Sequence, residues 1–454
     1  MMVETRPFGS DHWQGNEDSG LLLGWPLAEE MVTRSLGFVT APSSFGTQRS
    51  AREEIWFNQE GHCITIAPTG AGKGTSCLIP ALLTYLGPVI VVDPKGEAYR
   101  VTARWRRSLG HQVIRLDPFG VIANETDALN PLDLMELEGV HPEDEARTVA
   151  ELLTGGKQST KDPFWDQTGQ AFLSGLVAWL ATSVPREDRR LSKLRELFGE
   201  SDLPYTLAVM LDKNEVQSMD ARQEFAIFLS HPERETRPSV QSTAQQHVRH
   251  FGSPAVRRAT DSSTFSLKDV IDGKPLSIFI IVPPTKLDSH RNLLRLWIGT
   301  LLFALSMRRR HPARRTLLLV DEAAHLGNLA VLQQAITLYR SYGVNVWSFW
   351  QDASQLRSLY PDSWPTIVNN CAVVQLFGAR NQRTAEEFAS LVGGITSEAV
   401  MRLSHDQQLL LLNGGSPLIC RRPNYLRDAL FQGRYDHNPL YSEQEVGKGS
   451  SPML

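Results

Sequence analysis

Residues 67–76, with the sequence APTGAGKGTS, combine glycines and one lysine in a spacing that suits phosphate binding. Glycines at positions 70, 72 and 74 let successive backbone N–H groups point inward at phosphate oxygens. Lys73 adds a point charge that reaches the β- and γ-phosphates, and the helix expected after the loop offers its N-terminus to an anion. The stretch therefore predicts a nucleotide site built from Thr69, Gly70, Ala71, Gly72, Lys73, Gly74, Thr75 and Ser76.

The loop departs from the common G-x-x-x-x-G-K-[ST] pattern at two positions. Ala67 stands where the first glycine is usual, and Gly74 stands where a hydroxyl side chain usually binds Mg²⁺. The hydroxyl must then come from Thr75 or Ser76, and we favour Thr75. A flexible turn between a strand and a helix is the alternative interpretation. The strand–loop–helix context of G-x-G-K favours ATP and Mg²⁺ as the ligands.

The run TLLLVDEA (316–323) supplies the acidic groups that such a site needs. An apolar strand ends in Asp321, which would support Mg²⁺ through water, and Glu322, which would polarise a water for attack on the γ-phosphate. A strand that ends in solvent-facing acids would look the same. The pairing with the glycine loop favours an ATP-hydrolysing site.

Two further polar residues have uses that the local pattern leaves open. Gln351 ends the strand-like run VNVWSFWQD, where it could sense the γ-phosphate or be an ordinary polar residue at a strand end. Arg340 stands near a helix end, where it could be an arginine finger into a neighbouring subunit or a charge that matches the helix dipole. From the residues alone the second interpretation of Arg340 is favoured.

The elements around these residues alternate between strand and helix, which predicts a doubly wound α/β fold with a mostly parallel sheet. Between about 134 and 260 the spacing is helical and strand-like runs are nearly absent. The predicted organisation is a flexible segment over 1–44, a nucleotide-binding domain in two parts over 45–133 and 261–433, an all-helical insertion over 134–260, and a disordered tail over 434–454.

The composition is that of a soluble globular protein, with 41% hydrophobic and 21% charged residues among 454. A net charge of −4 gives no general case for nucleic-acid binding, and four widely spaced cysteines fit a reducing cytoplasm. The apolar runs LLLGWPLA and QQLLLL fall short of the ~20 residues that span a bilayer. We therefore expect no membrane span. The basic clusters 104–107 and 308–315 are interpreted as solvated, with phosphate or acidic-partner binding as the alternative.

Five stretches resemble the type IV secretion coupling proteins, the RecA-like conjugative-transfer ATPases of the TraG/TraD type, in order over roughly residues 45–430. They are APTGAGKGTSCLIPALLTY, VIVVDPKGEAYRVTARWRRSLGHQVIRLDPFG, DPFWDQTGQAFL, LLLVDEAAHLGNL and WQDASQLRSLYPDSWPTIVNNC. The resemblance implies a RecA-like P-loop NTPase domain with an inserted all-α domain for substrate docking. Many members carry a glycine after the loop lysine, as at Gly74.

The resemblance also implies a homohexamer with ATP between subunits, which drives relaxase-bound DNA or protein effectors toward a secretion channel. Lys73, Asp321, Glu322 and Gln351 fall on matching motif positions, and Arg340 falls where the family's arginine finger is expected. Typical members carry N-terminal transmembrane helices. We expect this chain to be a cytoplasmic member that docks on a separate membrane protein or anchor at the inner membrane.

Two other functions are compatible with the same residues. One is a free double-stranded-DNA translocase of the FtsK/HerA kind, which the lack of an anchor favours slightly. The other is an ATP-gated adaptor that recruits relaxase or effector with little hydrolysis, against which the full set of Lys73, Asp321 and Glu322 argues.

Overall fold

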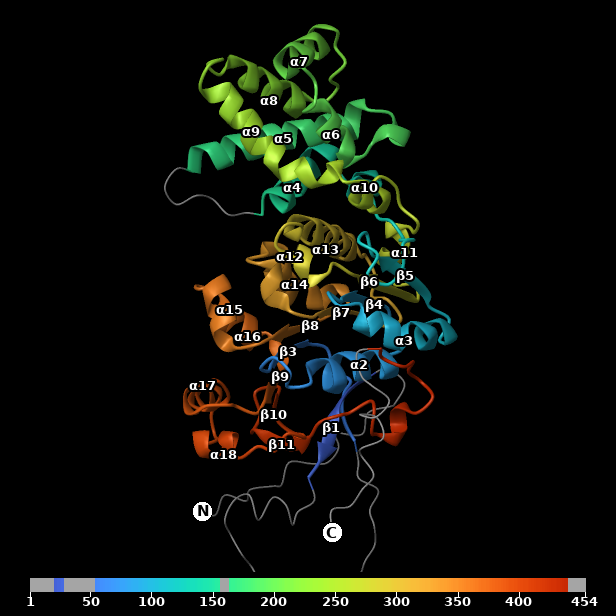
Figure 1. Ribbon diagram of the computed structural model, residues 1–454, viewed down its shortest axis with the longest axis vertical. Coiled ribbons are helices and arrows are strands. Elements are labelled where there is room, and N and C mark those ends of the chain that lie inside the picture. Colours follow the sequence, from blue (N-terminus) through green and yellow to red (C-terminus); the bar gives the residue numbers. More distant parts are fainter. Residues whose placement is uncertain (1–19, 28–53, 156–162, 440–454) are drawn as a thin grey trace, which may run out of the picture.

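A computed structural model describes residues 20–27, 54–155 and 163–439, and in these residues eleven strands form a single sheet (Figure 1). The strands follow one another in the order β2-β1-β11-β10-β9-β3-β8-β7-β4-β6-β5. Their bounds are β1 Leu21–Pro26, β2 Ile55–Phe57, β3 His62–Ile66, β4 Val89–Val92, β5 Gln112–Leu116, β6 Leu276–Ile280, β7 Thr316–Val320, β8 Val344–Trp350, β9 Cys371–Phe377, β10 Gln407–Leu412 and β11 Leu418–Arg421.

The seven strands from β9 to β5 run parallel, and an antiparallel extension of β10, β11, β1 and β2 follows on the β9 side. Ile66 at the end of β3 pairs with Trp350 of β8 and with Leu376 of β9, so these strands finish at one edge of the sheet. Ligands of open parallel sheets bind outside this carboxyl edge, next to a change in strand order. The fold confirms the RecA-like α/β prediction.

Alternate residues of the strands face two different helix layers, as the period of two requires. Ile64, Ile90 and Leu318 point to the core shared with α13 (Arg291–Ser306), while Cys63 and Val91 point to the core shared with α2 (Ile79–Thr84). A π turn, Gly74–Leu78, leads into α2. The helices around the sheet are α2 Ile79–Thr84, α3 Glu97–Ser108, α11 Leu267–Ile271, α12 Pro284–Leu287, α13 Arg291–Ser306, α14 Ala330–Leu338, α15 Ala353–Leu359, α16 Trp364–Asn369, α17 Gln382–Val392 and α18 Ser397–Met401.

Seven of the described α-helices between β5 and β6 form a helical body at one end of the molecule, where α4 packs against α13 (Figure 1). All of them fall within the predicted all-helical insertion over 134–260, whose limits stay a prediction. The helices are α4 Pro142–Thr154, α5 Pro163–Ser183, α6 Leu191–Leu197, α7 Leu203–Asp212, α8 Met219–Ser230, α9 Thr236–Val248 and α10 Pro254–Thr260.

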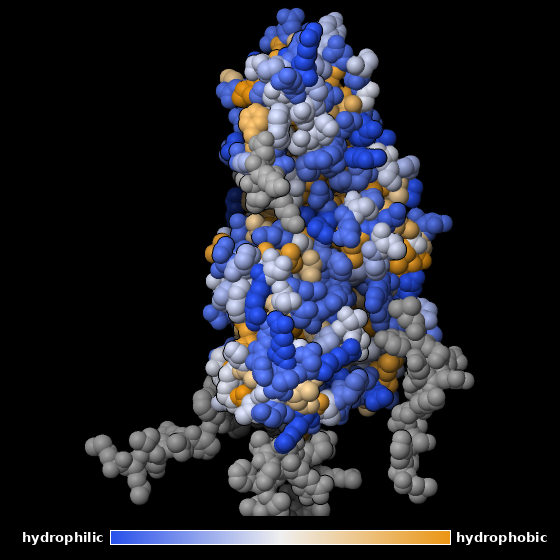
Figure 2. All heavy atoms as spheres, turned by 60° about the vertical axis from the view of Figure 1, so that its left-hand side comes forward, coloured by the Kyte–Doolittle hydropathy of each residue, from blue (hydrophilic) through white to orange (hydrophobic). Residues whose placement is uncertain are grey.

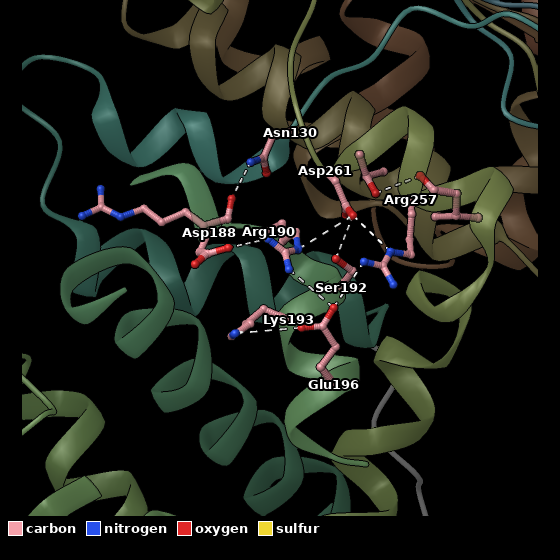
Figure 3. Close-up of polar contacts among 11 residues, drawn as sticks. Asn130, Asp188, Arg190, Ser192, Lys193, Glu196, Arg257 and Asp261 are labelled. Atoms are coloured by element: carbon pink, nitrogen blue, oxygen red, sulfur yellow. Dashed lines mark hydrogen bonds and ion pairs between the residues drawn. The ribbon is translucent and has the colours of Figure 1, made fainter. Parts of the chain in front are cut away.

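The two chain segments that join this helical body to the sheet run side by side. Leu129 N donates to Ala259 O at 3.0 Å, and Thr264 N donates to Ala128 O at 2.9 Å. Figure 3 shows the polar cluster beside them, in which Asp261 accepts from Ser192 and Arg257. The cluster fixes α6 and α10 to the point where the chain enters and leaves the helical body.

Three expectations about irregular segments need correction. Within the predicted flexible segment 1–44, residues 21–26 form the buried strand β1, while the remaining predicted residues lie outside the described ranges. Within the predicted disordered tail, Asp436 N donates to Val101 O at 2.9 Å, so residues 434–439 lie against α3, and 440–454 lie outside the described residues. The run QQLLLL forms β10, which was not predicted as a strand.

The surface in Figure 2 is mostly hydrophilic from the helical body down to the sheet, with apolar side chains scattered over it. Single exposed apolar residues are normal for soluble proteins. Among the helices that the structure describes, none combines the length and the apolar character that crossing a membrane needs.

Candidate nucleotide site

The glycine loop lies between β3 and the π turn, at the carboxyl edge of the sheet. Lys73 is 8% exposed, and its Nζ donates to Ala67 O at 2.9 Å, so the lysine side chain folds back over the loop. Thr75 Oγ1 donates to Gly72 O at 3.0 Å, and Ser76 is buried. Both hydroxyls considered for Mg²⁺ thus come from the first turn after the loop.

Two of the three loop glycines have backbone conformations that residues with a side chain rarely adopt, whereas the third has an ordinary conformation. Gly70 has φ +75° and Gly72 has φ +88°, and a Cβ on Gly72 would lie 2.9 Å from Thr75 Oγ1. A Cβ on Gly74 would meet no atom closer than Glu97 Oε1 at 3.9 Å. The space beside Gly74 is therefore open, and its glycine is not a steric requirement of the loop.

The predicted acidic pair follows β7, and the predicted sensor follows its neighbour β8. Gln351 Nε2 donates to Glu322 Oε2 at 2.8 Å, and Glu322 N donates to Asp321 Oδ1 at 3.1 Å. Glu322 has φ +52°, a left-handed conformation that is uncommon for a residue with a side chain. Three predicted residues are thus held together by direct hydrogen bonds.

Burial and the neighbouring Glu322 carboxylate raise the pKa of Asp321 to about 6, while Lys73 and Lys95 lower it in part. Asp321 therefore lies close enough to Lys73 for their charges to interact. A partly buried carboxylate with a raised pKa gains most when a cation approaches it. The attraction between Lys73 and Asp321 shows that the glycine loop and the acidic pair belong to one site.

Asp93 is a member of the site that the sequence prediction missed. It follows β4, the neighbour of β7, and it is 2% exposed. Its Oδ2 accepts from Tyr99 N at 2.9 Å, which fixes the start of α3. Burial raises the pKa of Asp93 to about 7, and the nearby Asp321 adds to the rise. Its position after an apolar strand, in VIVVDPKGE, was the available signal.

Two arginines from the C-terminal part of the chain contact the glycine loop from the β9 side. Arg380, which follows β9, donates from Nη2 to Thr69 O at 2.9 Å. Arg422, which follows β11, donates from Nη1 to Ala71 O, and its guanidinium lies 4.4 Å from the centre of the Phe377 ring. Sequence reasoning missed both residues, because each comes more than 300 positions after the loop.

Arg340 lies apart from the residues above. It belongs to the 3₁₀ turn Tyr339–Tyr342, just before β8 begins, and so lies at the amino edge of the sheet. Its side chain is 62% exposed, and Nε lies 3.5 Å from Glu60 Oε2. Within one chain Arg340 therefore cannot contact a nucleotide at the carboxyl edge.

One arginine in each basic cluster is buried and binds backbone carbonyls. Arg106 donates to Tyr85 O and Gly87 O and to the Ser277 hydroxyl. Arg308 donates to two carbonyls in the last turn of α11, to Val270 O at 2.8 Å and to Ile271 O at 2.9 Å. The solvated interpretation is therefore wrong for these two residues, which join segments distant in the sequence.

The residues present fit a nucleotide with a divalent cation. The left-handed glycines shape a concave loop, and Lys73 supplies a cation within it. A Cβ on Gly70 would meet only Arg380 Nη2 at 3.8 Å, which leaves open space on the ligand side. On the other side lie Asp321 and Glu322, whose oxygens are the ligand type that Mg²⁺ prefers, directly or through water.

A family model described as "Type IV secretory system Conjugative DNA transfer" matches residues 23–400. The conjugal transfer protein TraG of Escherichia coli is 27% identical over 361 residues, which cover 75% of this chain and 56% of that protein. Protein VirD4 of Rhizobium radiobacter is 26% identical over 413 residues, which cover 82% of this chain and 59% of that protein. The chain thus spans little more than half the length of these relatives.

Solved structures of the plasmid coupling protein TrwB share the fold. The unbound monoclinic form of a bacterial conjugative coupling protein, TrwBdeltaN70, has a TM-score of 0.61 at 17% identity and covers 94% of this chain and 99% of that one. TrwB in complex with ADP and Mg²⁺ has a TM-score of 0.59 at 16% identity, with 92% and 99% covered.

Proposed function

The chain belongs to the type IV secretory system conjugative DNA transfer family, and from this premise we propose that it is an ATP-hydrolysing coupling protein. It would bind MgATP at the glycine loop and drive DNA with its relaxase, or protein effectors, toward a secretion channel. One observation carries the catalytic part of the proposal: Glu322 and Gln351 are hydrogen-bonded to each other beside the loop that holds Lys73. The TrwB complex with ADP and Mg²⁺ supports the ligand.

We propose a separate task for each side chain of the site. The loop N–H groups and Lys73 would bind the phosphates, and Asp321 and the Thr75 hydroxyl would hold Mg²⁺, which when bound supplies positive charge to the phosphate oxygens. Gln351 occupies Glu322 Oε2, so Oε1 remains to accept a proton from water. The water oxygen would then bond to the γ-phosphorus, and the bond to the ADP oxygen would break.

The position of Arg340 supports a role between subunits. Because it lies at the amino edge of its own sheet, it could reach a nucleotide only in another copy of the chain. Its ion pair with Glu60 is exposed, and exposed pairs contribute little, so the arginine can leave it at low cost. We infer a ring, a homohexamer by resemblance to the family, in which Arg340 completes the neighbour's site.

The helical body is the proposed docking region for relaxase-bound DNA or effector. It packs on α13 through α4 and lies away from the antiparallel end of the sheet (Figure 1). We further propose that the protein works at the cytoplasmic face of the inner membrane, with a membrane protein of the secretion channel as its partner.

The first test measures the ATPase rate against protein concentration, with and without single- and double-stranded DNA. Lys73→Ala should abolish MgATP binding, whereas Glu322→Gln should bind MgATP and hydrolyse it at least about a hundredfold more slowly than wild type. A rate that rises cooperatively with concentration would support a ring. Wild-type turnover in Glu322→Gln would refute the catalytic assignment.

A further inference from the structure

Arg380 presents a cation at the rim of the glycine loop. It is exposed, and its Nη2 donates to Thr69 O at 2.9 Å. Apart from Gly70 and the residues on either side of it, the same Nη2 is the one heavy atom of the described residues within 4 Å of a Cβ built on Gly70. The guanidinium therefore borders the open space above the loop where a phosphate would lie.

Most of the N–H groups of Arg380 make no hydrogen bond to the described residues. A guanidinium carries five N–H donors. Among the described residues, only the donation to Thr69 O is made, and no acidic side chain forms an ion pair with Arg380. A free cation at an anion site is what a phosphate ligand requires.

Arg422 shows what an arginine with a purely structural task looks like in the same region. It is 6% exposed, donates to Ala71 O and to His405 O, and lies against the Phe377 ring. Its guanidinium is enclosed by the protein. Arg380 contacts the loop with one N–H and leaves the rest of its guanidinium free.

The strand order places Arg380 opposite the hydrolytic residues. β3 lies between β8 and β9, and all three end at the carboxyl edge. Gln351 follows β8 and holds Glu322 on one flank of the loop, while Arg380 follows β9 on the other flank. A terminal phosphate that faces Glu322 would thus have Arg380 at its opposite side.

We propose that Arg380 is a further nucleotide-binding residue, which donates from its free N–H groups to the terminal phosphate of a nucleoside triphosphate bound to the same chain. This inference rests on the proposed ATPase function. A guanidinium pairs with phosphate through charge-assisted hydrogen bonds, which are stronger than neutral ones. Arg340 would reach the same phosphate from a neighbouring subunit, so the two arginines are separable.

The experiment compares the affinities of the full-length protein for ADP and for a non-hydrolysable ATP analogue, both with Mg²⁺. Arg380→Ala should weaken the affinity for the ATP analogue by about tenfold to a hundredfold. The affinity for ADP should change by less than about twofold. Arg380→Lys, which keeps the charge but loses the planar fork, should fall in between. Arg383→Ala is the matched control, because this exposed arginine makes no hydrogen bond to the loop in the part of the chain that is described.

The possible outcomes separate a failure of the Arg380 inference from a failure of the proposed ATPase function. An equal loss of ADP and analogue affinity would make Arg380 only a support for the loop, which overturns the inference. Unchanged affinity for both ligands would also overturn it. Failure of the wild-type protein to bind either nucleotide would instead refute the ATPase proposal, and the Lys73→Ala variant sets the level of no binding.

Discussion

Gln351 donates a hydrogen bond from Nε2 to Oε2 of Glu322 at 2.8 Å, across the ends of two neighbouring parallel strands. The bond reaches a glutamate whose backbone is left-handed, at φ +52°. Backbone strain of this kind costs about 1–3 kcal/mol and persists only where surrounding contacts enforce it. Gln351 is one such contact. The proposed sensor, Gln351, therefore also orients the carboxylate of the proposed base, Glu322.

Gln351→Leu should therefore lower turnover more than binding. Without the amide, Glu322 loses the donor that orients it, and we expect kcat to fall about tenfold or more while MgATP affinity changes little. Steady-state kinetics with equilibrium binding checks this. Gln334→Leu, on an exposed position of α14, is the control. Equal losses in kcat and affinity would mean that Gln351 supports the loop instead.

The open space beside Gly74 predicts that a side chain is tolerated there. Gly74→Ser should fold, keep nucleotide binding, and gain up to about 0.5 kcal/mol of stability, because serine is a better helix former than glycine. Gly72→Ala is the matched opposite: its φ of +88° and the Thr75 hydroxyl at 2.9 Å should make it lose binding. Thermal unfolding and nucleotide titration measure both. A Gly74→Ser protein without binding would contradict the geometry.

Asp93 predicts a pH dependence of stability in the nucleotide-free protein. Burial raises its pKa from 3.8 to about 7, so the folded state holds the proton more tightly than the unfolded chain. This contribution to the free energy of unfolding is fully present below about pH 4 and is lost as the pH rises through about 7. Asp93→Asn removes the titration.

The measurement is chemical unfolding of wild type and Asp93→Asn at pH 5 and at pH 8. The free energy of unfolding of Asp93→Asn minus that of wild type should be larger at pH 8 than at pH 5. The increase should be on the order of a few kcal/mol at most. A difference that is equal at both pH values would show that Asp93 does not titrate in this window.

If Arg340 acts on the nucleotide of a neighbouring subunit, two inactive variants should restore activity when their subunits are mixed. Arg340→Ala removes an exposed side chain and should fold normally, yet its oligomer should hydrolyse ATP slowly. Glu322→Gln should also be slow. In a mixture, a Glu322→Gln subunit can donate Arg340 to an Arg340→Ala neighbour, so activity should reappear. A mixture as inactive as its components would place the arginine outside the neighbour's site.

The central strands could be predicted because they are buried on both faces. Runs such as VIVV in β4 and TLLLV in β7 are apolar at every position, and polar residues that follow them must lie at the carboxyl edge. The pairing of Gln351 with Glu322 follows from the same rule once β7 and β8 are neighbours. β10 was missed because its Gln408 is buried, bonded to Gln375 and Leu23 O, and those partners are distant in sequence.

Arg380 could not be found in the same way. Its neighbours show no pattern that separates it from any arginine after a strand. Its place depends on the order β9-β3-β8, which brings a late strand beside an early one. The buried Arg106 and Arg308 were misjudged for a related reason, because the carbonyls that they bind belong to segments that the local sequence does not identify.

The strand order also bears on when the protein becomes functional during its synthesis. β3 carries the glycine loop, but its sheet neighbours β8 and β9 begin only at Val344 and Cys371. The chain must therefore be synthesised beyond Phe377 before β3 can pair with both of its neighbours. The contacts among α5, α8 and α9 lie within the helical body, so this part can form before the sheet is complete. In a nascent chain these helices would thus form before the glycine loop is flanked by β8 and β9.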